Sequence, residues 1–159
     1  MTMIWMLAPA SAHGLAAGHG ALQLDDHKAR LVLAPEASTF PEADDDGDGL
    51  LDIDELKAHR ELLLDRVRDE IAVIGEDGAA ELTLADVLPG VDHHAGTAGH
   101  FVKLVLTYTF GTPQDHVALH YELFGPEVDT LELSVATPEV RGVVDLTWLH
   151  PVTVLREAP

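Results

Sequence analysis

The chain has 159 residues, the length of one ordinary domain, and 47% of them are hydrophobic, so it can bury a core of its own. Its 28 acidic and 9 basic residues give a formal net charge of −19 at pH 7, which disfavours nucleic acid and anionic membranes as partners and favours cations. The absence of cysteine excludes disulfides, thiolate metal sites and a cysteine nucleophile.

Residues 1–12 are interpreted as the remnant of a signal peptide. The apolar run from Met3 to Leu7 is followed by Ala10-Ser11-Ala12, the small-x-small pattern of a signal-peptidase site. No Lys or Arg precedes this run, and it is shorter than the roughly seven to fifteen residues of a usual signal core, so an apolar N-terminal strand is the alternative. We expect export, with residues 13–159 forming a single β-rich domain. No other stretch approaches the roughly 20 apolar residues that cross a bilayer, so no transmembrane segment is expected.

Residues 20–35 are predicted to form a β-hairpin. On either side of a polar turn at Asp25 to Lys28, leucines occupy alternate positions, as in a strand with one buried face. Pro35 and Pro41 then bracket five residues, which is room for about one helical turn. A strongly acidic segment begins three residues after Pro41.

This acidic segment runs from Asp44 to Glu55, DDDGDGLLDIDE, and carries seven carboxylates in twelve residues, which repel one another. Their order fits a calcium loop, with carboxylates first, third and fifth, a glycine sixth for the sharp bend, and a glutamate twelfth. Such a loop wraps its backbone around the ion because Ca²⁺ takes about six to eight oxygen ligands. A bound divalent cation would neutralise the repulsion.

In these features the segment resembles the EF-hand family. The resemblance implies Ca²⁺ as the cofactor, with one backbone carbonyl and one direct or water-mediated carboxylate completing the set. The implied metal ligands are Asp44, Asp46, Asp48, the carbonyl of Leu50, Asp52, and the bidentate Glu55. The segment before the loop is too short for the entering helix of a complete EF-hand, and the sequence has no second loop. We therefore expect a structural ion and not a paired calcium sensor.

One long helix is predicted over residues 53–74, directly after the loop. Asp52 and Glu55 form the capping-box pattern at its start, and Gly75 is a typical stop. One face of this helix carries apolar residues at helical spacing and would pack against the rest of the fold. These residues are Leu56, Leu63, Val67, Ile71 and Ile74.

Beyond residue 80 the apolar pattern changes to period 2, which is typical of strands with one buried face. Strands are predicted at 81–88, 100–110, 116–124, 131–135, 143–149 and 152–155. Short strands at this spacing favour a sandwich. The expected fold class is α+β and β-rich, an antiparallel β-sandwich-like domain with one long α-helix following the EF-hand-type loop.

Ten histidines offer a second kind of metal site, because imidazole suits Zn²⁺ and Cu²⁺. Three of them lie in the segment DHHAGTAGH, residues 92–100, and His116 and His120 are predicted to share the exposed face of one strand. Removal of the signal segment would leave His13 as the first residue, and its free amine and ring would together chelate copper. In this N-terminal histidine the chain resembles exported copper proteins. A histidine-based copper or zinc protein is therefore the alternative to a calcium protein.

The sequence contains no G-x-S-x-G motif, glycine-rich phosphate loop or dinucleotide fingerprint, so no enzymatic activity is predicted. We predict an acidic, secreted or periplasmic calcium-binding protein, and the sequence does not identify its protein partner. The acidic Asp/Gly loop and helix among strands also resemble the extracytoplasmic N-terminal domains of HupE/UreJ-type membrane proteins. That resemblance implies an accessory domain associated with a separate membrane subunit.

Overall fold

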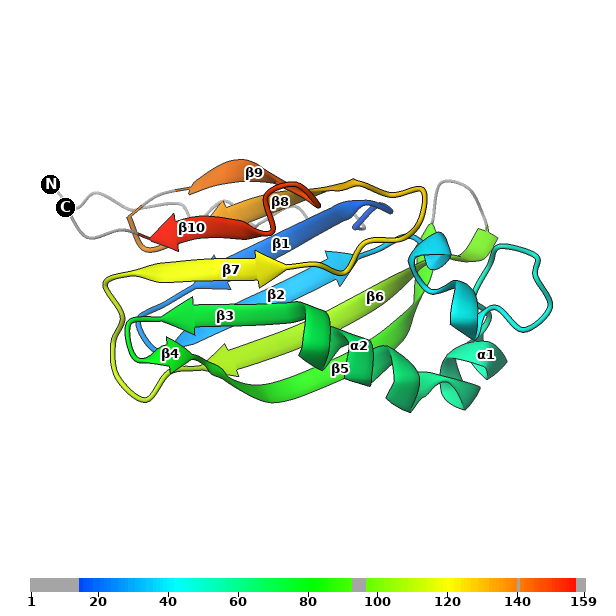
Figure 1. Cartoon of the computed structure of the whole chain (residues 1–159), viewed down its shortest axis with the longest axis horizontal. Coiled ribbons are helices and arrows are strands. Elements are labelled where there is room, and N and C mark those ends of the chain that lie inside the picture. Colours follow the sequence, from blue (N-terminus) through cyan, green and yellow to red (C-terminus); the bar gives the residue numbers. More distant parts are fainter. Residues whose placement is uncertain (1–14, 93–96, 140, 157–159) are drawn as a thin grey trace, which may run out of the picture.

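Two β-sheets stack face to face in the computed structural model, which describes residues 15–92, 97–139 and 141–156 (Figure 1). The larger sheet has the strand order β5 (Glu81–Asp92), β6 (Thr97–Thr109), β2 (Lys28–Ala34), β1 (His19–Leu24), β8 (Thr130–Ala136) and β9 (Arg141–Thr147). The smaller sheet has the order β10 (Val152–Arg156), β7 (Val117–Tyr121), β3 (Ile71–Gly75) and β4 (Gly78–Ala79). The expected signal segment lies outside the described residues, and so do His13, His93 and His94.

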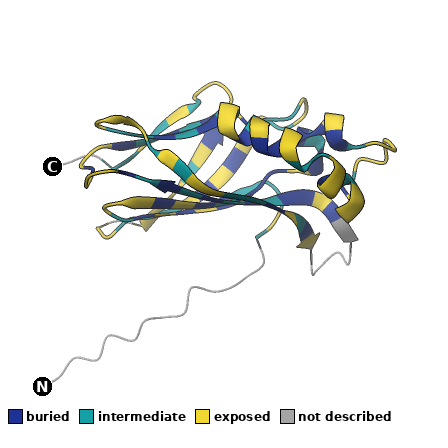
Figure 2. Cartoon of the chain, turned by 90° about the horizontal axis from the view of Figure 1, so that it is seen from below, coloured by how far each residue is buried: buried dark blue, intermediate teal, exposed yellow. Residues whose placement is uncertain are grey.

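Buried and exposed residues alternate along the strands (Figure 2). The buried side chains form the hydrophobic core between the two sheets. The buried set includes Leu22, Leu24, Leu31 and Leu33 from the hairpin, Leu104 and Leu106 from β6, and Leu119 and Tyr121 from β7. The predicted hairpin is confirmed, and so are the predicted strands beyond residue 80, whose ends shift by a few residues. The period of 2 identifies these strands correctly because each one has a single face in the core.

Two short 3₁₀ helices, η1 (Ala37–Thr39) and η2 (Pro41–Ala43), connect β2 to the acidic loop. η1 is the single turn predicted between Pro35 and Pro41, whereas η2 begins at Pro41 and was not predicted. Phe40 lies between them and is fully buried. The guanidinium of Arg66 lies 5.3 Å from the centre of the Phe40 ring and donates a hydrogen bond of 2.6 Å to the carbonyl of Thr39. The segment that leads into the loop is thereby fixed to the helical segment that follows it.

The prediction of one long α-helix over 53–74 is wrong. That segment contains α1 (Ile53–Ala58), a break at His59, α2 (Arg60–Glu70) and then strand β3. At the break, φ of −103° and ψ of 11° lie outside the helical range. Ile71 is extended and pairs with Tyr121 of β7. The apolar positions from Ile71 to Ile74 fit a period of 2 as well as 3.6, and their β-branched side chains favour the strand once a partner strand is available.

The prediction of an antiparallel sandwich is also wrong for the larger sheet, although the β-rich character is confirmed. Strands β1 and β8 run parallel, with His19 opposite Glu132, while the other strand pairs of the described residues are antiparallel. Parallel and antiparallel pairs share the same alternation of side chains, so the sequence pattern does not distinguish them. Between β2 and β8 the chain forms β3 to β7, of which β3, β4 and β7 belong to the smaller sheet. Strand β8 then returns to the larger sheet beside β1, and this path makes that sheet mixed.

Helix α2 lies along one side of the sandwich, where it contacts β3 and β5 (Figures 1 and 2). Its buried residues are Leu63, Leu64 and Val67. Within the part of the chain that the structure describes, neither helix has the length and apolar character needed to cross a bilayer. The acidic loop directly precedes α1, and both lie at one end of the sandwich (Figure 1).

Candidate metal site in the acidic loop

The acidic loop is shaped by hydrogen bonds between its own carboxylates and its own backbone. Asp44 Oδ1 accepts from the N–H of Gly47 at 2.7 Å, and Asp44 Oδ2 accepts from the N–H of Gly49 at 2.9 Å. Asp46 accepts from the N–H of Asp48 at 3.1 Å. Both glycines have positive φ, 75° and 80°, a conformation that side chains with a Cβ rarely adopt. The alternation of Asp and Gly is therefore what allows the chain to turn around its own carboxylates.

Three of the predicted ligands converge. Asp44, Asp46 and Asp48 each offer a carboxylate oxygen within 4.8 Å of the others, and they are the group of potential metal-binding side chains found among the described residues. Asp44 is half-buried, whereas Asp46 and Asp48 are exposed. Three negative charges at this separation repel one another unless a cation lies between them.

The other predicted ligands hold the end of the loop. Glu55 Oε1 accepts from the N–H of Asp45, and Oε2 accepts from the N–H of Asp52, both at 2.9 Å. Asp52 in turn accepts from the N–H groups of Asp54 and Glu55, which completes a capping box at the start of α1. The predicted capping box is therefore confirmed. The Glu55 carboxylate bridges the first and last turns of the loop, and it is not one of the three that converge.

Leu50 occupies the predicted carbonyl position, and its N–H donates to Asp48 Oδ1 at 2.8 Å. This bond fixes the Gly49–Leu50 peptide group, whereas the Leu50 carbonyl belongs to the next peptide group. The ligand roles of Leu50, Asp52, Glu55 and the three converging aspartates all stay predictions.

The electrostatics of the loop raise the pKa of Asp46. The largest single influence, the hydrogen bond from the N–H of Asp48, lowers this pKa. Desolvation and the negative charges of Asp48, Glu55 and Asp44 outweigh that hydrogen bond, so the pKa lies above its usual value. The loop is thus an environment in which an added negative charge is disfavoured and a cation is favoured.

Two contacts outside the twelve residues anchor the loop, and sequence reasoning missed both. Leu51 is fully buried, and its N–H donates to the carbonyl of Gly99 in β6 at 2.9 Å. Gly99 has φ of 95°, and a Cβ at this position would lie 3.0 Å from the Leu51 oxygen. His59 Nε2 lies 2.9 Å from Asp45 Oδ1. The sequence does not reveal the contact with Gly99, because this residue is far from the loop along the chain and the pattern around it indicates histidine ligands instead.

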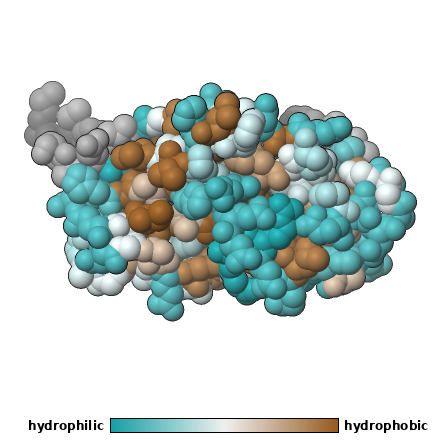
Figure 3. All heavy atoms as spheres, viewed as in Figure 1, coloured by the Kyte–Doolittle hydropathy of each residue, from teal (hydrophilic) through white to brown (hydrophobic). Residues whose placement is uncertain are grey.

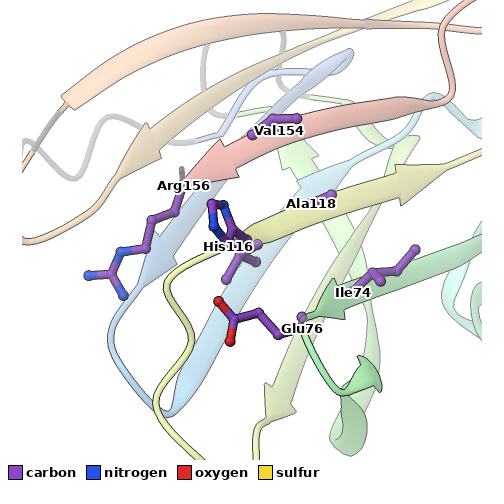
Figure 4. Close-up of a pocket in the computed structure, with 8 residues that line it drawn as sticks. Ile74, Glu76, His116, Ala118, Val154 and Arg156 are labelled. Carbon is purple, nitrogen blue, oxygen red and sulfur yellow. The ribbon is translucent and has the colours of Figure 1, made fainter. Parts of the chain in front are cut away.

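The described histidines do not gather into a comparable site. His120 contacts Glu122 at 3.2 Å, whereas His116 lines a separate surface hollow of about 260 Å³ (Figure 4). Glu76 and Arg156 border the same hollow, but Arg156 donates its hydrogen bonds to Asp26, Glu139 and the carbonyl of Gln114. Within the described residues, no cluster of three metal-binding side chains includes a histidine.

Comparison with known proteins adds no assignment. No protein-family model matches this chain, and no curated protein matches it.

Proposed function

We propose that this chain is a calcium-binding protein and that the ion binds in the acidic loop, residues 44–55. The observation that carries the proposal is the convergence of Asp44, Asp46 and Asp48, whose carboxylate oxygens lie within 4.8 Å of one another. Carboxylate and carbonyl oxygens suit Ca²⁺, whereas Zn²⁺ and Cu²⁺ favour imidazole and thiolate ligands. The order of the donors supports a site of the EF-hand type, with the Leu50 carbonyl, Asp52 and Glu55 as the remaining ligands.

The ion has a structural role in this proposal. Asp44 directly follows η2, Glu55 belongs to α1, and Leu51 between them is attached to β6. A cation held by the loop would therefore join three parts of the fold. An ion that binds only the folded state stabilises it, by about 2.7 kcal/mol when the free ion is present at 100 times its Kd.

Export is part of the same proposal, and it is supported by the signal-like pattern before His13. Outside the cytoplasm, a calcium site can function with a Kd as weak as roughly 10⁻⁴–10⁻³ M. No catalytic role is proposed for the chain.

Calorimetric titration of metal-stripped protein with Ca²⁺, combined with thermal unfolding in calcium and in chelator, tests the proposal. We expect one site per chain and a higher unfolding midpoint in calcium. Glu55→Gln should weaken binding by about tenfold or more, which is about 1.4 kcal/mol. The matched control is Glu61→Gln in α2, where the side chain is 77% exposed and its carboxylate contacts Arg60.

Equal effects of the two substitutions would contradict the ligand assignment. Absence of binding at millimolar calcium would contradict the proposed function. If Zn²⁺ or Cu²⁺ instead bound tightly, with a pH dependence that survives removal of calcium, the histidine alternative would replace it.

A further inference from the structure

The two long sides of the sandwich differ in how their strand edges are protected. On one side, α2 contacts β5, which is also interrupted by register shifts at Leu82/Leu84 and at Pro89/Val91. The neighbouring edge of the smaller sheet is β4, which is two residues long. Covering helices, bulges and very short strands are the devices that keep a sheet edge from pairing with another chain. This side is closed to further strands.

On the opposite side, β9 ends the larger sheet and β10 ends the smaller sheet, and no strand of the described residues pairs with either outer edge. We call these two strands and the turn between them, Arg141–Arg156, the open edge. Five large hydrophobic side chains of the open edge are 54–65% exposed, namely Val143, Trp148, Leu149, Val152 and Val154. β10 also has a register shift, between Val154 and Arg156, but α2 lies on the other side of the sandwich, and Val152 to Val154 pair regularly with β7.

A groove separates the two strands of the open edge. It has a volume of about 150 Å³, and its walls include Val143 and Val144 from β9 and Val154 and Leu155 from β10. Apolar surface therefore continues from one sheet edge across the groove to the other. Exposed apolar surface that is continuous in this way is typical of interaction sites.

On its outer side, the groove continues into an apolar row across the smaller sheet. The strand pairings place Ile74 opposite Ala118, and Ala118 opposite Val154 (Figure 4). Hydrophobic side chains gather over β10 and the adjacent part of β7 on this face of the molecule (Figure 3). A strand added beside β10 would extend this row.

The open edge carries little net charge, unlike the rest of the chain. Arg141–Arg156 contains two arginines and one aspartate, and Arg156 is already paired with Asp26 and Glu139, whereas the whole chain carries −19. Two acidic molecules repel each other least when they meet through surfaces of this kind. The open edge is thus the part of the surface where a second copy of the chain can approach closely.

The geometry points to a second copy of this chain as the partner of the open edge, in a symmetric dimer joined strand to strand. Antiparallel pairing of β10 about Val154 would place this residue against Val154 of the second copy and double the apolar row. Antiparallel pairing of β9 about Val144 would place Arg141 diagonal to Asp145 of the second copy, and the reverse by symmetry. Val144 and Val154 line the same groove, so one two-fold axis through the groove serves both pairings.

Sedimentation velocity of the full chain, from about 1 μM to about 1 mM, tests this inference independently of calcium. We expect a monomer–dimer equilibrium that shifts toward dimer as salt rises from about 20 mM to about 500 mM, because salt screens the repulsion between the acidic bodies. Val154→Lys should weaken dimerisation at least about tenfold by placing a charge on the axis. Leu84→Lys is the matched control, because Leu84 is 49% exposed on the protected strand β5.

Val143→Lys provides a second variant at the open edge, and circular dichroism of all variants reports whether they are folded. A folded wild-type chain that stays monomeric throughout this range at high salt would overturn the inference and leave the edge available to a different strand. Equal weakening by Leu84→Lys and Val154→Lys would also overturn it. Loss of the dimer in Val154→Lys and Val143→Lys, with its retention in Leu84→Lys, supports it.

Discussion

The acidic loop and the open edge are both surface features, but the chain builds them in different ways. The loop forms a dense set of hydrogen bonds among residues at most eleven positions apart, and one buried residue, Leu51, attaches it to the core. The open edge has strands from two different sheets and exposes its hydrophobic side chains to solvent. Local sequence therefore determines the loop, whereas strand order determines the edge.

The strongest contrast between these regions concerns stability. Leu51→Ala removes a fully buried side chain at the point where the loop meets β6, and we expect it to lower the free energy of unfolding by about 2–5 kcal/mol. Val152→Ala, at a side chain that is 54% exposed on the open edge, should change it by about 0.5 kcal/mol or less in the monomer. Denaturant unfolding in chelator, at a concentration where the protein is monomeric, measures both. Similar losses from the two substitutions would mean that Leu51 does not anchor the loop.

The same difference explains what the sequence predicts well. Carboxylate positions, the glycines at positive φ and the capping box of Asp52 and Glu55 all depend on neighbours within twelve residues, so a motif describes them. Gly99 contacts the loop from 48 positions beyond Leu51, and only the completed β6 reveals it. Ile71 to Ile74 fit both a helix and a strand, and their pairing with β7 decides between the two. Strand order is likewise a tertiary property, which is why the sequence does not show that β9 and β10 are edges.

Backbone conformation gives a second way to compare the regions. Gly99→Ala forces a Cβ into a position with φ of 95° and places it 3.0 Å from the Leu51 oxygen, so we expect a loss of about 1–2 kcal/mol. Gly142→Ala in β9 is the matched control, because a Cβ there meets no atom within 4 Å and its φ is not positive. This control should be neutral or stabilise the chain by up to about 1 kcal/mol, since alanine restricts the unfolded state. Thermal unfolding of both variants is the measurement, and equal losses would remove Gly99 as a specific support of the loop.

The smallest expected effect is that of the Asp46 charge on the unfolding midpoint. Because the pKa of Asp46 is raised in the folded chain, its contribution to stability is present below the unfolded pKa and is lost as the pH rises through the folded pKa. Asp46→Asn should therefore raise the unfolding midpoint slightly in chelator at neutral pH, and this gain should vanish in acid, where Asp46 is protonated.

In calcium the same substitution should have the opposite effect, because it removes a proposed ligand and the stability that the bound ion would provide. Asp69→Asn in α2 is the matched control, because it removes one exposed charge that lies outside both the loop and the open edge. Its effect on the midpoint should be the same in calcium and in chelator. A midpoint for Asp46→Asn that shifts in the same direction under both conditions would show that the loop carboxylates repel one another without binding the ion together.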